Sequence, residues 1–152
     1  MTDVIQIRPI ARSDYTNWLP LWDGYNAFYG RLGSTALDPA ITACTWERFF
    51  DDSEPVFALV AELDGQIVGL THYLYHRSTT RIAPVCYLQD LFTLADFRGR
   101  GIARKLIEGV VDTTRQAGVQ RVYWQTHQSN TSARLLYDRI GKHAGFIVYL
   151  IE

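Results

Sequence analysis

The chain has 152 residues, 47% of them hydrophobic and 13% aromatic, and a formal net charge of −1 at pH 7. This length predicts one domain over residues 1–152, and the apolar content predicts a globular chain rather than a disordered one. A charge so close to neutral supplies no basic footprint for nucleic acid. No signal peptide opens the chain and no apolar run reaches the roughly 18 residues of a membrane span, so we expect a cytoplasmic protein without a membrane or nucleic-acid partner.

Hydrophobic periodicity predicts three elements in the first third of the chain. Residues 4–8 alternate in polarity, which is typical of a strand. An aromatic helix is expected next, capped by Asp14 and extending to Tyr29, with a kink or break at Pro20. A second helix over residues 38–50 has a proline at its first helical position.

A β-hairpin is expected in the middle of the chain. Residues 56–63 and 66–76 are apolar runs that predict two strands. Between them, Asp64-Gly65 is a strong signal for a two-residue hairpin turn. The two strands should therefore pair in antiparallel fashion.

The last third of the chain predicts three more elements. Residues 120–126 form an apolar run that predicts a strand, and Asn130 can cap a helix that Gly141 ends. Residues 146–151 predict a closing strand. With the strand and helix of residues 85–118, the whole order is β-α-α-β-β-β-α-β-α-β, a mixed α+β sheet protein.

The most informative stretch runs from Val85 to Arg104. Its first half is an uninterrupted apolar strand, and its second half places Gly99 and Gly101 between arginines and opens into a helix. A short glycine-bearing turn at a helix N-terminus exposes backbone N–H groups where the helix dipole is positive. The stretch therefore predicts an anion site, most often for phosphate.

Three phosphate-binding patterns compete for this turn. The P-loop pattern GxxxxGK[ST] is absent, and the dinucleotide pattern GxGxxG lacks its third glycine because Arg104 stands there. The third pattern, [RQ]-x-x-G-x-[GA], is present at residues 98–103 as RGRGIA. It is the coenzyme A pyrophosphate signature of the GNAT acetyltransferases, a superfamily that this sequence resembles.

The resemblance extends over the whole chain. Residues 87–106, YLQDLFTLADFRGRGIARKL, are similar to the diamine N-acetyltransferases, and residues 122–137, VYWQTHQSNTSARLLY, to the yeast-type histone and polyamine acetyltransferases. The resemblance implies the GNAT acyl-CoA N-acyltransferase fold, with a central, mostly antiparallel twisted sheet flanked by helices. It also implies that two strands of this sheet splay apart and that acetyl-CoA lies in the cleft between them.

The same resemblance implies which residues bind acetyl-CoA. Three groups are expected: a strand edge for the pantetheine arm, the glycine turn for the pyrophosphate, and the start of the last helix. The residues are Leu91, Phe92 and Thr93 on the strand; Arg98, Gly99, Arg100, Gly101, Ile102, Ala103 and Arg104 in the turn; and Asn130, Thr131, Ser132, Ala133 and Tyr137 at the last helix. No metal is expected.

The resemblance further implies direct transfer of the acetyl group in a ternary complex. An alkyl ammonium has a pKa of about 10.4 and is not a nucleophile until it loses a proton. The neutral amine then attacks the thioester, the Phe92 N–H stabilises the oxyanion, and the Tyr137 hydroxyl protonates the leaving thiolate. Tyr137 is alternatively a packing residue.

The general base is left open by the sequence. A glutamate of the diamine enzymes corresponds to Gln89, which cannot accept a proton, and Asp90 should point to the opposite face of the strand. A water chain, His72 or His127 are the alternatives. The residues expected to bind the acceptor are Gln89, Asp90, Trp22, Tyr25 and His127.

The function expected from the sequence is therefore N-acetylation of a small primary amine such as a polyamine or an amino acid. The alternatives are a protein lysine acetyltransferase and a non-catalytic acyl-CoA-binding module. Cys44 and Cys86 are expected to be reduced packing residues, and His72 and His76 lie too far apart along a strand for one metal ion. A homodimer is expected, because the closing strand can pair with a second subunit, as in many family members.

Overall fold

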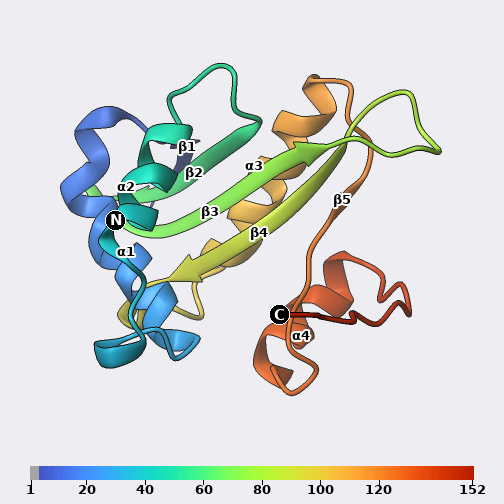
Figure 1. Cartoon of the computed structure of the whole chain (residues 1–152). Helices are drawn as coiled ribbons and strands as arrows, with labels where there is room; N and C mark the ends of the chain where they lie inside the picture. Colours follow the sequence, from blue (N-terminus) through green and yellow to red (C-terminus); the bar gives the residue numbers. More distant parts are fainter. Residues whose placement is uncertain (1–3) are drawn as a thin grey trace.

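The computed structural model describes residues 4–152, which form one five-stranded sheet with helices on both faces (Figure 1). The strands lie in the order of the chain: β1 (Ile5–Pro9), β2 (Val56–Leu63), β3 (Gln66–His76), β4 (Val85–Thr93) and β5 (Val122–Tyr123). The helices are α1 (Tyr15–Phe28), α2 (Pro39–Arg48), α3 (Ile102–Gln116) and α4 (Thr131–Ile140). All neighbouring strands are antiparallel except β4 and β5, which are parallel.

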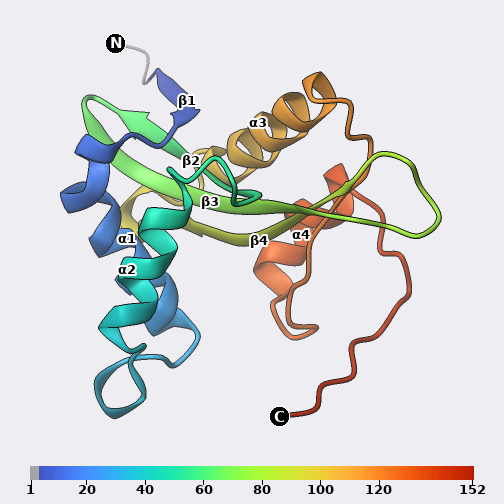
Figure 2. The ribbon, with the colours of Figure 1, turned by 45° about the horizontal axis from the view of Figure 1, so that its top comes forward.

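Each face of the sheet carries its own buried cluster. Helix α3 covers one face and packs its apolar stripe, Ile102, Leu106 and Val110, on side chains from β2, β3 and β4. Helices α1 and α2 lie together on the other face (Figure 2), where the cluster is mainly aromatic and includes Trp18 and Trp46. The α+β arrangement expected from the sequence is confirmed.

The hairpin between β2 and β3 forms as the sequence predicts. Asp64 and Gly65 have φ values of 51° and 76°, so both central residues of the turn are left-handed, as a type I′ turn requires. The start of α2 is also as predicted, because the Asp38 carboxylate accepts a hydrogen bond of 2.8 Å from the Ala40 N–H. The helix ends at Arg48, slightly before the predicted boundary.

A β-bulge on β4 changes which side chains face which layer. His72 of β3 pairs with Asp90, but the next residue of β3 pairs with Leu88, so Gln89 is an extra residue without a partner. Side chains of a regular strand alternate, and one extra residue reverses that alternation. As a result Leu88 lies in the cluster under α3, while Asp90 lies on the α1 side with His72.

Of the kink or break predicted at Pro20, the break does not occur. The helix runs through Pro20 without interruption. Proline removes one backbone bond, and the carbonyl that loses its partner belongs to Thr16, an exposed residue that water can reach. The predicted Asp14 cap is also wrong, because the Asp14 carboxylate instead binds the Arg8 guanidinium at 2.8 Å and the Ala11 N–H at 2.7 Å.

The C-terminal region departs most from the sequence prediction. Only Val122 and Tyr123 of the predicted strand 120–126 pair with β4, and residues 146–151 form no strand. The side chains of residues 146–151 are 68–99% exposed. The physical reason is that β5 leaves β4 after two residues and offers this segment no ladder to extend (Figure 1).

Other expectations concern metals, cysteines and membranes. Over residues 4–152, no cluster of three or more His, Cys, Asp or Glu side chains is suited to a metal ion. Cys44 is exposed and Cys86 is buried, and both are free thiols. In the same described range, every helix is too short or too polar to cross a bilayer.

Candidate active site

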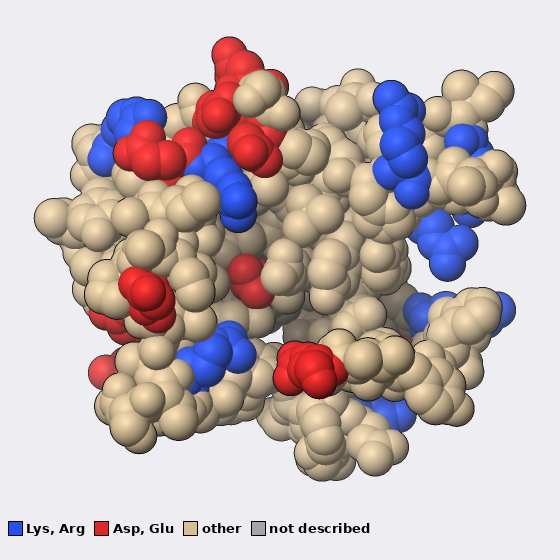
Figure 3. Space-filling view, viewed as in Figure 1, with Lys and Arg blue, Asp and Glu red and all other residues tan. Residues whose placement is uncertain are grey.

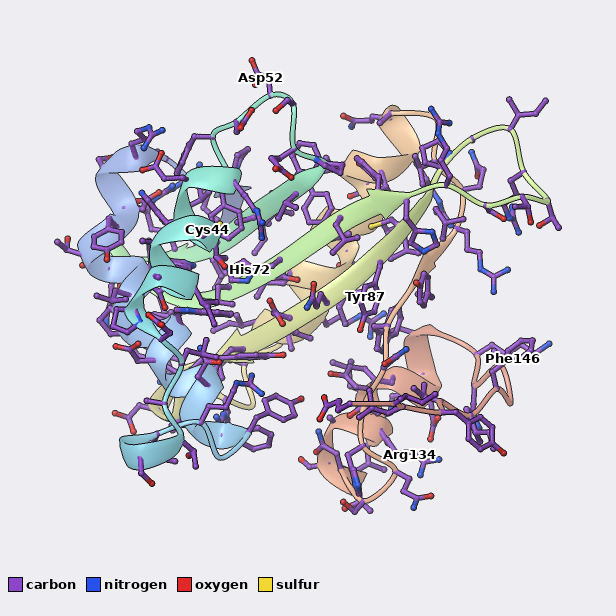
Figure 4. All side chains as sticks on the ribbon, in the orientation of Figure 1. Cys44, Asp52, His72, Tyr87, Arg134 and Phe146 are labelled. Atoms are coloured by element: carbon purple, nitrogen blue, oxygen red, sulfur yellow. The ribbon has the colours of Figure 1, made fainter. Side chains whose placement is uncertain are left out.

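The candidate site begins where β4 and β5 separate. The two strands pair only at Cys86 with Val122 and at Tyr87 with Tyr123, so the rest of β4 has an open edge on that side. In the space-filling view the surface is hollowed between the layer of α1 and α2 and the α4 region (Figure 3). Figure 4 shows Tyr87 on β4 beside this opening, with Arg134 of α4 across it.

The register of β3 and β4 identifies the backbone groups that face the open edge. The Leu94 N–H donates to the Val68 carbonyl at 2.9 Å, and hydrogen-bonded residues alternate along an antiparallel ladder. Phe92, which pairs with Leu70, therefore directs its N–H toward β3. The N–H groups of Leu91 and Thr93 point the other way, into the opening. The Phe92 N–H is thus occupied by the ladder, and Leu91 takes its place as the candidate oxyanion donor.

Beyond β4, the chain makes the predicted glycine turn and enters α3. Gly99 and Gly101 have φ values of 77° and 78°, and a Cβ on either glycine would meet no atom within 4 Å. Gly101 is also the N-cap of α3 and supplies no side-chain cap. The first N–H groups of α3 therefore lie at an open surface without a side-chain partner, which is the geometry of a phosphate site.

The arginines around this turn mostly support its structure. The Arg98 Nε donates to the Thr93 carbonyl at 3.1 Å, and its guanidinium lies 5.6 Å from the Phe92 ring centre. Arg104 pairs with Glu108, one helical turn later, at 2.9 Å. Positive charge is thus present near the turn, while the direct contacts to an anion would come from backbone N–H groups.

Thr93 contains an unsatisfied polar atom at the same edge. Its Oγ1 is buried and has no hydrogen-bond partner within the described chain. A buried hydroxyl without a partner costs about 1–3 kcal/mol. The groups at the open edge of β4 that can serve a coenzyme with amide groups are instead the backbone N–H groups of Leu91 and Thr93.

Helix α4 places Tyr137 on the far side of the opening. The Tyr137 ring packs edge-on against Trp124 at 5.6 Å between ring centres and borders the cluster under α3. Burial raises the pKa of the Tyr137 hydroxyl above its ordinary value, and the neighbouring Tyr29 adds to the shift. The hydroxyl is therefore protonated at neutral pH and able to donate.

On the α1 side, two hydrogen bonds link three side chains. The Trp18 indole N–H donates to His72 Nε2 at 3.1 Å, and His72 Nδ1 lies 2.9 Å from Asp90 Oδ2. The Tyr25 hydroxyl lies near Asp90, and burial, followed by the charge of Asp90, raises the pKa of Tyr25. The indole can only donate, so His72 Nε2 is the acceptor and His72 carries its proton on Nδ1. This Nδ1–H donates a hydrogen bond to the Asp90 carboxylate. Figure 4 shows His72 on β3, between the sheet and the α1 and α2 layer.

Comparison with known proteins identifies the family of this chain. The sequence matches the acetyltransferase (GNAT) family over residues 18–142. The chain belongs to this family. It is therefore an N-acetyltransferase with acetyl-CoA as acetyl donor.

Two full-length relatives support the GNAT assignment. The chain is 30% identical to the D-amino-acid N-acetyltransferase HPA3 of Saccharomyces cerevisiae, over 98% of this chain and 91% of that protein. It is 28% identical to the N-acetyltransferase YhfO of Bacillus subtilis, over 97% of each chain. A similar GNAT fold occurs in the aminoglycoside acetyltransferase AAC(6')-Iy, solved with a CoA bisubstrate analogue, with a TM-score of 0.80, 20% identity and 98% coverage of each chain.

Several residues predicted to bind the acceptor or the coenzyme have other partners within the chain. The Trp22 indole donates to Thr42 Oγ1 of α2 at 3.1 Å and stacks inside the aromatic cluster. Gln89 is the exposed bulge residue, and His127 is exposed and bonds to Ser129 of its own loop. Asn130 was predicted to cap α4, but its amide donates to Thr126 Oγ1 at 3.2 Å instead.

The structure adds contacts for two aromatic residues of the first helix. Trp18 completes the hydrogen bonds of His72, and Tyr29, at the end of α1, influences the pKa of Tyr25, Tyr87 and Tyr137. The aromatic spacing along residues 15–29 predicts a mainly buried helix, and the family resemblance implies that part of it walls the acceptor pocket. The individual partners of Trp18 and Tyr29 have no signal in the sequence.

Proposed function

We propose that this GNAT enzyme acetylates the primary amine of a small molecule by direct attack on acetyl-CoA. The observation that carries the proposal is the continuous path from the open edge of β4 to the uncapped N-terminus of α3. That path provides N–H groups for a chain with amides and then for a pyrophosphate. A cytoplasmic, single-domain enzyme is part of the same proposal.

The coenzyme side of the mechanism uses backbone groups. The Leu91 and Thr93 positions pair with the pantetheine arm, and N–H groups between Gly99 and Arg104 hold the pyrophosphate. The Leu91 N–H donates to the thioester oxygen. This bond strengthens as negative charge develops there, and a donor fixed by the sheet needs no reorganisation.

The acceptor side begins with an ammonium ion held by Asp90. A carboxylate fixed by His72 attracts the cation and takes one proton from it, directly or through water. The neutral nitrogen attacks the carbonyl carbon, and a C–N bond forms as the carbonyl electrons move onto oxygen. Collapse of this intermediate breaks the C–S bond, and the thiolate receives a proton from Tyr137. The nitrogen, which is positively charged after the attack, then loses its second proton through water to the Tyr137 phenolate, which restores the phenol and leaves a neutral amide.

A small acceptor is favoured over a protein lysine. The end of α1 covers β4 closely, since a Cβ on Gly24 would lie 2.9 Å from the Phe92 ring. The yeast relative is named for D-amino acids, and the solved neighbour for an aminoglycoside, both small amines. A lysine side chain of a folded protein would need more space between α1 and β4 to reach the acetyl group.

We further propose that the enzyme is a homodimer through its last ten residues. Six large apolar side chains in a row, residues 146–151, are exposed in a single chain, which is unfavourable in water. A second copy can supply the missing ladder for this segment and remove the exposed edge. Light scattering should give a dimer for the whole chain and a monomer for Ile147→Lys with Leu150→Lys, and a monomeric wild type contradicts this part of the proposal.

The central test is release of coenzyme A thiol from acetyl-CoA in the presence of mixed small amines, with Tyr137→Phe as the variant. The change keeps the ring and its packing but removes the proton donor. General acid catalysis is worth about 10²- to 10⁴-fold, so kcat should fall by that factor while acetyl-CoA affinity stays unchanged.

A control variant and two outcomes complete this test. Tyr15→Phe changes a partly exposed tyrosine at the start of α1 and should leave kcat unchanged. A kcat of Tyr137→Phe within about threefold of wild type, where chemistry limits the rate, would remove Tyr137 from the mechanism. Acetyl-CoA binding without turnover on any amine would favour a binding module.

A further inference from the structure

Arg31 follows α1 and is held in place by a buried amide. Its Nε donates to Asn26 Oδ1 at 2.7 Å and its backbone N–H donates to the Asn26 carbonyl at 2.8 Å. Asn26 is only 5% exposed, and its own amide group donates to the Trp22 carbonyl at 2.9 Å. The guanidinium is therefore fixed at one edge by a residue whose side chain is fully used.

The rest of the guanidinium lies beside the rings of Tyr25 and Tyr29, which we call the aromatic wall, and not beside a carboxylate. Its carbon lies 5.8 Å from the Tyr25 ring centre and 5.4 Å from that of Tyr29, and these two rings are 5.0 Å apart. Among residues 4–152, no carboxylate forms an ion pair with Arg31. Both terminal NH₂ groups thus remain available to a ligand at the edge of this wall.

Tyr25 connects Arg31 to the carboxylate of the acceptor site. Its ring centre lies 6.4 Å from that of Phe92 on β4, and its hydroxyl lies near Asp90. The same hydroxyl is affected by both charges, because Asp90 raises its pKa and Arg31 lowers it. A negative and a positive side chain therefore flank one tyrosine without pairing with each other.

Figure 3 shows charged atoms around the hollow between the α1 and α2 layer and the α4 region, with acidic atoms in its floor and both basic and acidic atoms at its rim. A ligand with one charge of each sign, separated by a short distance, is complementary to such a surface. A diamine has two positive charges, so its second ammonium would meet the guanidinium.

We propose that the acceptor is an α-amino acid, with Arg31 binding its carboxylate and Asp90 its ammonium. The inference rests on the proposed N-acetyltransferase function and names the substrate class of that site. A guanidinium offers two parallel N–H donors to a carboxylate, and a single carbon separates carboxylate and ammonium in an α-amino acid. Arg31 is thereby the residue that determines specificity, and Asp90 is the one next to the reacting nitrogen.

The test compares each acceptor with its own carboxamide, which keeps the amine and loses the carboxylate. The panel is D- and L-alanine, D- and L-phenylalanine, their primary amides and 1,4-diaminobutane, assayed by thiol release with wild type and Arg31→Gln. We expect wild type to prefer amino acids of at least one configuration to their amides. Arg31→Gln should lower kcat/KM for those acids about 10- to 100-fold and leave kcat/KM for the amides unchanged.

Arg81→Gln is the matched control, since Arg81 is an exposed arginine in the loop between β3 and β4. This variant should leave kcat/KM unchanged both for the amino acids and for their amides. Calorimetric binding of the preferred amino acid to the CoA-bound protein gives a readout without turnover and should weaken by a similar factor in Arg31→Gln.

Two results would overturn the inference while leaving the acetyltransferase intact. One is an equal loss of kcat/KM for amino acids and for amides in Arg31→Gln. The other is a wild type that prefers the amides or the diamine to every amino acid. A wild type that neither acetylates nor binds any of these amines would overturn both this inference and the proposed function.

Discussion

The two faces of the sheet are built from different side chains. Under α3 the buried side chains are mostly aliphatic, with Leu106 and Val110 completely inaccessible to solvent. Under α1 and α2 they are mostly aromatic and enclose the chain of hydrogen bonds from Trp18 through His72 to Asp90. The sheet is the same, yet the described face under α1 and α2 is the one that encloses a hydrogen-bonded histidine and carboxylate.

The difference shows how a small domain can separate stability from chemistry. Indole and phenol side chains fill volume and still carry a donor, so they can surround a buried histidine and carboxylate without leaving them unsatisfied. Aliphatic side chains offer no such donors, and their face contributes packing alone. Substitutions on the two faces should therefore affect different measured quantities.

The largest expected effect comes from Asp90→Asn on the aromatic face. The amide keeps the shape and can still accept from His72, but it carries no charge to hold and deprotonate an ammonium. We expect kcat/KM for the amine to fall about 10²- to 10⁴-fold, with a nearly unchanged melting temperature. Asp96→Asn, an exposed aspartate beyond β4, is the control. Steady-state kinetics within threefold of wild type would show that Asp90 is structural.

Leu106→Ala on the aliphatic face should lower stability and leave catalysis unchanged. Removing a fully buried leucine leaves a cavity, and such changes cost about 2–5 kcal/mol of unfolding free energy. Urea denaturation should show this loss, whereas kcat per folded molecule should be unchanged. Leu135→Ala, at a position 66% exposed, should cost little. An active-site defect in folded Leu106→Ala would mean that the two faces are coupled.

The smallest effect should come from Trp18→Phe, which removes the donor to His72 and leaves Nε2 buried without a partner. An unsatisfied buried acceptor costs about 1–3 kcal/mol. Trp22→Phe is the matched control, because it removes a similar bond to Thr42, a half-exposed residue that water can satisfy. Urea denaturation should show a larger loss of unfolding free energy for Trp18→Phe than for Trp22→Phe. Equal losses would mean that the hydrogen bond to His72 contributes no more to stability than the bond to Thr42.

Much of the fold could be predicted because the signals were local. The hairpin at Asp64-Gly65, the Asp38 cap and the glycine turn before α3 each depend on a few adjacent residues, and all three appear as expected. The splayed strand pair followed from the family resemblance. These features need no knowledge of distant neighbours.

The features that could not be predicted depend on such neighbours. Residues 146–151 have the composition of a strand, but a strand requires a partner ladder, and β5 offers none within the chain. The role of the Phe92 N–H depends on which side of β4 it faces, and the register decides that. Arg31 has no sequence motif at all, and only its contacts with Asn26 and two tyrosines distinguish it.

The bulge at Gln89 has a consequence for how this enzyme is compared with its relatives. Aligning β4 letter by letter matches a family glutamate to Gln89, whose side chain is exposed, while the carboxylate inside the molecule belongs to the next residue. A functional residue can therefore move by one position in an alignment and keep its place in space. For this strand, equivalence between homologues is better assigned from superposed backbones than from columns of an alignment.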